Sequence, residues 1–383
     1  MNAEQIRELA STVPLVDHHC HGLVRTPITA EVFEDLATES DTGQPDGFTV
    51  FDSPLGVAIR AECGPLLGLP RHAAPADYLA ARSALGDAES ARRLLAGTGI
   101  SRYLVETGYR SDDILSPAET AGLGGGTSSQ VVRLEVIAEQ VAAAGTGAEE
   151  FGARFADALA EAAAPTVGLK SIIAYRYGLD FDPAPPSVRE VAAAAGEWLA
   201  AGPADPATGR WRLEHPVLLR AVLWAGVALG KPLQFHVGYG DSDIVLHRCD
   251  PTKMTGFLHA TASAGCPVML LHCYPFIREA GYLAQVYPHV YLDTGAAVHF
   301  TGASSRALIA QSLEVAPFAK LLFSSDAFGL AELYYLGARL WRQGTGAILA
   351  SWVERDEISA ADAARYLHAI GHGNAERVYG VSA

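Results

Sequence analysis

The chain has 383 residues, of which 49% are hydrophobic and 19% are charged, and its formal net charge is −15. This composition is typical of a globular protein with a large core and argues against an intrinsically disordered chain. The net negative charge argues against nucleic acid or an anionic membrane surface as a partner.

The cysteines and the N-terminus bear on where the protein works. The five cysteines are scattered and odd in number, with no Cys-x-x-Cys pair, which favours reduced thiols over a disulfide framework. The first residues are not a basic segment followed by an apolar one, so we expect no signal peptide. No apolar stretch has the length that a bilayer requires. We therefore expect a cytoplasmic protein.

The first predicted elements are an amphipathic helix over residues 2–10 and an apolar strand over residues 13–18. The strand runs into Asp17-His18-His19-Cys20-His21. Because alternate side chains of a strand leave the same face, His19 and His21 can bind one metal ion together. By the same alternation Cys20 points away, so we do not expect it to be a ligand.

Two long regions interrupt the pattern of strands. Residues 25–98 predict a helical insertion after the first strand, with helices near 30–38, 75–85 and 87–96. It is too long for a simple crossover, so it either caps the mouth of a barrel or forms its own helical subdomain. Residues 176–216, rich in Pro, Gly and Asp, predict a second insertion of loop and helix after the fourth strand.

Short apolar runs recur between helical segments along the chain. With residues 13–18 there are eight, the others being 101–106, 131–137, 167–175, 232–237, 267–273, 290–294 and 321–325. Helices over 216–229, 331–343 and 359–370 follow later strands. Apolar strands alternating with helices predict an α/β fold, and eight such units predict a single (β/α)8 TIM barrel over residues 1–383. A doubly wound open sheet is the alternative, but no Gly-x-Gly-x-x-Gly motif follows the first strand.

Candidate metal ligands occur at the ends of further predicted strands. Lys170 lies in the fourth strand, His236 ends the fifth, His272 ends the sixth, and Asp326 follows the eighth. Active sites of such barrels lie at the carboxyl ends of the strands. Each residue alone would more often be structural, but their joint placement predicts a site for Zn²⁺, or for Mn²⁺ or Fe²⁺.

This ligand pattern resembles the amidohydrolase superfamily of metal-dependent hydrolases, in order and in strand assignment. Two segments, 168–176 and 274–283, are similar to the amidohydrolase-2 type. Within that type they resemble the amidohydrolase-like half of FluG and of nodulin–glutamine synthetase fusion proteins. The resemblance implies that His19, His21 and Asp326 hold a first metal ion, with His236 completing its shell. It implies that His272 either holds a second metal ion or hydrogen-bonds the substrate oxygen.

The number of metal ions depends on Lys170. The resemblance implies that this lysine is carboxylated and bridges two metal ions in binuclear members, whereas one ion suffices in mononuclear members. We therefore expect one or two metal ions per chain. From its residue type alone, Lys170 also fits a buried ion pair with Glu106 or Glu135.

The reaction that the resemblance implies is hydrolysis of a C–N bond of the amide type by a metal-activated water. Asp326 would act as general base and then as general acid, and His272 would polarise the carbonyl oxygen. A γ-glutamyl amide is one substrate class, by analogy alone. A metal-dependent decarboxylase, a C–C lyase on the same site, is the alternative. A non-catalytic barrel is a third reading, and it predicts no tightly bound metal.

Four further residues are candidates for binding a small-molecule substrate. Arg176 follows the fourth strand and would pair with a carboxylate. Asp241 and Asp243 follow His236 and would bind an ammonium group. Arg278 follows the sixth strand. Ion pairs explain the arginines equally well, and an Asx turn is the commoner use of aspartates in such a loop. We also expect a homo-oligomer.

Overall fold

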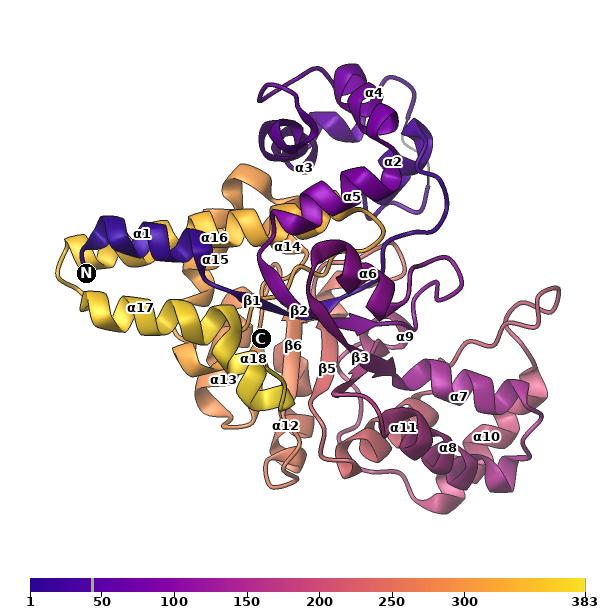
Figure 1. Cartoon of the computed structure of the whole chain (residues 1–383). Helices are drawn as coiled ribbons and strands as arrows, with labels where there is room; N and C mark the ends of the chain where they lie inside the picture. The colour runs from indigo at the N-terminus through magenta and orange to yellow at the C-terminus, as the bar shows by residue number, and fades with distance from the viewer. Residues whose placement is uncertain (43–44, 383) are drawn as a thin grey trace.

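The structure, a computed structural model, describes residues 1–42 and 45–382. Within them, parallel strands form one seven-stranded sheet in chain order. The strands are β1 (Leu15–Cys20), β2 (Ile100–Glu106), β3 (Thr127–Arg133), β4 (Gly168–Ser171), β5 (Leu233–Val237), β6 (Val268–His272) and β7 (Val290–Leu292). Figure 1 shows these strands at the centre of the molecule with helices around them. Parallel strands in strict sequential order give the α/β, TIM-barrel-like topology that the sequence predicts.

The predicted eighth strand lies between β7 and β1 without forming a regular ladder. On one side Leu322 N–H donates to the Leu292 carbonyl at 3.1 Å, and on the other Asp326 N–H donates to the His19 carbonyl at 3.0 Å. The ladder fails locally because Ser325 N–H donates to the Asp17 carboxylate at 2.9 Å, and because Asp326 has a φ of 51°. The segment therefore connects the two edges of the curled sheet and ends at a candidate ligand.

The helices alternate with the strands along the chain. In order they are α1 (Ala3–Thr12), α2 (Ala30–Leu36), α3 (Pro54–Ala58), α4 (Pro75–Leu85), α5 (Asp87–Ala96), α6 (Pro117–Gly124), α7 (Leu134–Ala143), α8 (Ala148–Ala163), α9 (Ile173–Arg176), α10 (Val188–Ala201), α11 (Pro216–Ala228), α12 (Thr255–Thr261), α13 (Ile277–Val286), α14 (Ala297–Phe300), α15 (Ser305–Ser312), α16 (Ala331–Glu354), α17 (Ala360–His368) and α18 (Asn374–Tyr379). None of the described helices combines the length and the apolar character needed to cross a lipid bilayer.

Several predicted boundaries differ from the observed ones. The third predicted strand extends too far, because α7 begins at Leu134 and carries Glu135 on a helix. The predicted helix 331–343 ends too early, because α16 continues through Gly344 and Gly346. A Cβ on these glycines would lie 2.6 Å from Ile309 Cδ1 and 2.6 Å from Ala10 Cβ, respectively. These glycines therefore allow close packing of α16 and do not end the helix.

The helices of residues 25–98 lie together at one end of the molecule, at the top of Figure 1. The predicted helices 75–85 and 87–96 are confirmed as α4 and α5. The buried Glu332 at the start of α16 accepts from Arg82 Nε at 2.9 Å and from Tyr78 Oη at 3.0 Å. A charge-assisted buried contact of this kind fixes the region against the barrel helices. That the region is an insertion capping the barrel mouth stays a prediction.

A small apolar cluster fills the inside of the sheet. It combines Val16, Leu104 and Val131 from three strands with Met269 and Leu271 from β6, and Tyr379 of α18 packs into it. The large core between the sheet and the surrounding helices is a separate cluster. The C-terminal helix α18 therefore contributes a side chain to the interior of the sheet, beneath the candidate site.

Candidate metal centre

The carboxyl ends of the strands open into one cavity of about 1000 Å³. All six predicted ligands line it: His19, His21, Lys170, His236, His272 and Asp326. They come from β1, β4, β5, β6 and the segment after β7, which are far apart in the sequence. The fold thus brings the predicted residues to one place.

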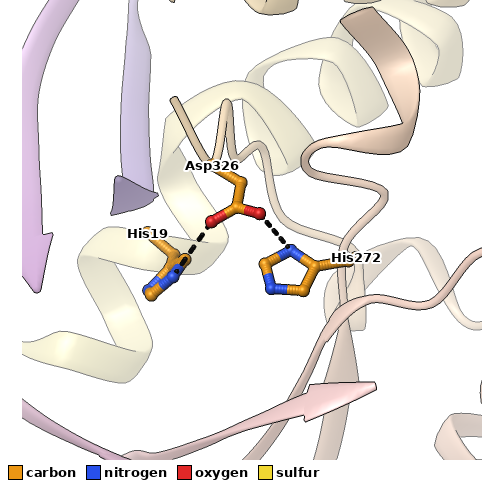
Figure 2. Close-up of side chains that lie close together, drawn as sticks. All are labelled: His19, His272 and Asp326. Atoms are coloured by element: carbon orange, nitrogen blue, oxygen red, sulfur yellow. Dashed lines mark ion pairs between the residues drawn. The ribbon is translucent and has the colours of Figure 1, made fainter. Parts of the chain in front are cut away.

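Three of the six form a tight cluster, shown in Figure 2. The Asp326 carboxylate lies between two imidazoles, with Oδ1 3.2 Å from His19 Nε2 and Oδ2 3.0 Å from His272 Nδ1. In the described part of the chain, this is the one group of three or more His, Cys, Asp or Glu residues close enough to share a metal ion.

The other two histidines adjoin this cluster. His21 Nε2 lies 3.7 Å from Asp326 Oδ1. The His236 ring lies 4.7 Å from the His272 ring, measured between centroids. Three imidazoles thus lie within 4 Å of the Asp326 carboxylate, whose side chain is 14% exposed, and His236 lies beside one of them. His272 contacts the same carboxylate as His19, so the geometry groups it with the first predicted ion.

The cluster has the donor chemistry of a metal site. His19 Nε2 and His272 Nδ1 face Asp326 without hydrogen-bond alignment, and His236 Nε2 has no partner among the described residues. Buried nitrogens in proteins are normally paired. Burial lowers the pKa of His19 and of His236 well below the usual range, so both rings are neutral. Neutral imidazoles beside a carboxylate are the ligand forms that Zn²⁺ takes, so the residues fit a metal ion.

Groups behind the rings set which nitrogen faces the cluster. Gln234 Nε2 donates to the His18 carbonyl and to Tyr379 Oη, each at 2.8 Å. Its Oε1 therefore accepts from His19 Nδ1, at 2.8 Å. His21 Nδ1 lies 3.1 Å from the Glu106 carbonyl. With the proton on Nδ1, each ring turns the lone pair of Nε2 toward Asp326.

His18 is a structural residue. The β1–β2 register shifts between Asp17 and Cys20, so strict alternation is interrupted and His18 reaches the interior together with His19. His18 Nε2 donates to Asp293 at 2.7 Å, and Tyr379 Oη lies 3.1 Å from its Nδ1.

Asp293, which follows β7, is a positioning residue that sequence reasoning missed. Its Oδ1 accepts from His272 N–H at 2.8 Å and from Gly295 N–H at 2.7 Å. His272 has a φ of 67°, a conformation that costs free energy for a non-glycine residue and persists only when neighbours hold it. An acidic residue inside the predicted apolar strand 290–294 was the available signal.

Lys170 does not form the ion pair that its residue type also allows. Glu106 instead binds Arg133, and Glu135 accepts from Ser171 Oγ at 2.6 Å. The lysine is 2% exposed. Burial lowers the pKa of Lys170 to about 8, with Asp326 acting in the opposite direction. A fraction of this buried amine is therefore neutral near physiological pH.

The outer wall of the cavity carries the predicted substrate-binding residues. Arg176 lines it and contacts Glu139 Oε1 at 3.3 Å. Asp241 and Asp243 line it on the loop after β5, and Asp243 pairs with Arg212 at 3.1 Å.

The same loop contacts both of the long regions. Arg212 belongs to residues 176–216, and Ser242 donates to Asp41 of residues 25–98. Side chains from both long regions therefore reach the rim of the cavity.

Arg278 lies apart from this site. Its guanidinium makes a bidentate contact with Glu314, at 2.7 and 2.9 Å, with both side chains exposed. It is not among the residues that line the cavity. Arg133 and His299 do line it, although the sequence did not single out either for substrate binding.

Known proteins match almost the whole length of this chain. The family model described as Amidohydrolase matches residues 16–381. Protein fluG of Emericella nidulans is 26% identical over 414 residues, an alignment that covers 98% of this chain and 46% of fluG. The chain thus spans about half the length of that relative.

Two solved structures share the fold. A protein from Lactobacillus casei that is assigned as a metal-dependent hydrolase has a TM-score of 0.84 and 29% identity, covering 98% of this chain and 97% of its own. A uronate isomerase from Bacillus halodurans has a TM-score of 0.68 and 11% identity, covering 99% and 96%. At that identity the second likeness concerns the fold alone.

Proposed function

This chain belongs to the amidohydrolase family and is an enzyme, and from that premise we propose that it hydrolyses an amide-type C–N bond of a small molecule. The observation that carries the proposal is the set of buried imidazoles with unpartnered nitrogens around Asp326, at the floor of a large cavity. We propose that they hold Zn²⁺, or Mn²⁺ or Fe²⁺ in its place.

His19, His272 and Asp326 would hold the ion, with His21 and His236 beside them. When bound, such an ion polarises a carbonyl oxygen and lowers the pKa of a coordinated water. The side chains of the protein supply the proton transfers. Burial acts to raise the pKa of Asp326, but the facing His272 holds it well below its usual range, so it is ionised. An ionised Asp326 can accept a proton and return it to the leaving amine.

Lys170 would determine whether a second ion binds. A neutral lysine amine is the form that reacts with carbon dioxide, and the burial of Lys170 favours that form. Carboxylated Lys170 would bridge two ions, and unmodified Lys170 would leave a single ion.

The outer wall supports a substrate with two charged ends. Arg176 can pair with a carboxylate and Asp241 with an ammonium group. A γ-glutamyl amide carries both groups, and it fits the proposal on this ground and by the family analogy.

Elemental analysis of the purified protein tests the metal. We expect one or two ions per chain, and Asp326→Ala and His19→Ala should each lose most of the metal and all activity. His368→Ala, which removes a surface imidazole outside the cavity, is the matched control and should retain both. A wild-type protein that binds no metal with micromolar or better affinity would refute the proposal.

A screen of N-acyl and γ-glutamyl amides tests the reaction. We expect an acid and an amine in equal amounts. Release of carbon dioxide from a carboxylic acid, with no amide cleaved, would replace the hydrolase with the decarboxylase.

A further inference from the structure

His299 is a buried histidine that the metal centre does not use. It lies on α14, the short helix after β7, and its side chain is fully buried. It nevertheless lines the cavity above the metal ligands. Its ring packs beside Phe300 at 4.7 Å between centroids, so one side of the imidazole is apolar.

Neither ring nitrogen of His299 has a hydrogen-bond partner among the described residues. Burial lowers the pKa of His299 to about 4, so at neutral pH the ring carries one N–H donor and one lone pair. Buried polar atoms are paired in native proteins, and a side chain with two unpaired atoms requires an explanation. The cavity is the side from which a partner can reach it.

The loop before α14 runs against the metal cluster. Asp293 accepts from Gly295 N–H at 2.7 Å and so pins the start of the loop. A Cβ at Gly295 would lie 2.8 Å from His272 Nδ1 and 3.1 Å from Asp326 Cβ, so the backbone passes directly against the metal ligands. His299 follows four residues later, and the charges of Asp326 and His272 both act on it.

We propose that His299 contacts the substrate directly and hydrogen-bonds the amide group that contains the scissile C–N bond. This inference rests on the proposed function for the identity of that group, an amide with one donor and one acceptor. The neutral imidazole can pair with one of these two through either its N–H or its lone pair. A substrate lacking a hydrogen-bonding group at this position leaves the imidazole unpaired and is rejected, because an unpaired buried polar group is costly.

Two variants at this position separate substrate contact from a structural role. His299→Phe keeps the ring and removes both polar atoms, and His299→Asn restores one donor and one acceptor. His289→Phe is the matched control, because His289 also has an unpartnered buried nitrogen but lies outside the cavity.

For His299→Phe we expect unchanged metal content, an unchanged or higher Tm, and a fall in kcat/KM of about ten- to hundredfold on the best amide substrate. His299→Asn should recover part of that loss. His289→Phe should leave kcat/KM within about twofold of the wild type. The combination of retained Tm and lost activity is the signature, since removing a structural histidine would lower both.

A binding measurement separates this inference from the proposed reaction. The probe is acetohydroxamate, a small metal-chelating amide analogue, titrated into the metal-loaded protein. If no amide is cleaved but His299→Phe weakens acetohydroxamate binding about tenfold at unchanged metal content, the reaction is wrong and the contact stands. If amides are cleaved and neither kcat/KM nor acetohydroxamate affinity changes, or if Tm and activity fall together, His299 is not a substrate contact.

Discussion

The cavity has a floor, formed by His19, His21, His272 and Asp326, and an outer wall, which carries Arg176, Asp241 and Asp243. The two parts are built differently. On the floor, the rings of His19 and His21 and the backbone of His272 are each hydrogen-bonded from behind by Gln234, Glu106 and Asp293, which are buried. On the outer wall, charged side chains pair with one another closer to solvent. Arg212 and Asp243 are 26% and 53% exposed, and Arg176 and Glu139 are 10% and 17% exposed.

The difference indicates which part does which task. A metal site requires ligands held to fractions of an ångström, and fully hydrogen-bonded buried groups provide that rigidity. Exposed ion pairs contribute little to stability and can exchange partners with a charged substrate. We therefore propose that the floor carries the metal chemistry and the outer wall the choice of substrate. Three predictions test this division.

The largest effect, on metal affinity, is expected from the buried groups that hydrogen-bond the metal ligands. Gln234→Met fills a similar volume but cannot accept from His19 Nδ1, so the ring loses its fixed tautomer. Metal affinity should fall about ten- to hundredfold. Tyr379→Phe removes only the hydroxyl that supports Gln234 and should have a smaller effect in the same direction. Competition with a chromogenic chelator measures both.

The control for these two variants is Gln130→Met, on an exposed position of β3 outside the cavity. Its metal affinity should equal that of the wild type. If Gln234→Met binds metal normally while remaining folded by circular dichroism, the ligands do not depend on the groups behind them and the comparison fails.

An intermediate effect is expected on the outer wall. Arg176→Met should raise KM about tenfold for amides that carry a carboxylate and leave kcat nearly unchanged. Amides without a carboxylate should show no difference, and metal content should be unaffected. A fall in kcat with constant KM would place Arg176 in the chemistry and would remove the division between floor and wall.

The smallest effect is expected at Arg278. Arg278→Ala breaks a surface ion pair with Glu314 and touches neither region, so KM, kcat and metal content should all stay at wild-type values. A change in KM would show that the substrate site extends beyond the cavity described here.

The floor was largely predictable from the sequence, because each ligand ends an apolar run and a parallel barrel brings such ends together. What lies behind the ligands was not. Gln234 lies in mid-strand with no local signal, and its partner Tyr379 is separated from it by 145 residues. The shift of register in β1 was also not predicted, because the alternation rule assumes a regular strand. That rule does not allow two consecutive residues, His18 and His19, to point to the same side.

The outer wall was predictable only as a list of charged candidates. Arg176, Asp241 and Asp243 line the cavity, whereas Arg278 does not, and all four follow strands in the same way. Tertiary contacts, such as that of Ser242 with Asp41, decide which loop lies over the mouth of the cavity. The hydrophobic periodicity of the sequence does not reveal such contacts. Sequence reasoning assigns His299 no role beyond a structural one, and α14 has only four residues, too few for a helical pattern.

The contact between His18 and Tyr379 joins residues 361 positions apart. During synthesis the β1 histidines emerge first, and the group that orders their surroundings emerges long afterwards. Contacts of such long range form late in folding and make it slow. Tyr379 of α18 supports Gln234, which fixes the tautomer of His19. Until α18 docks, the His19 ring could therefore carry its proton on either nitrogen. A metal ion bound at that stage would meet a ligand whose orientation is not yet fixed.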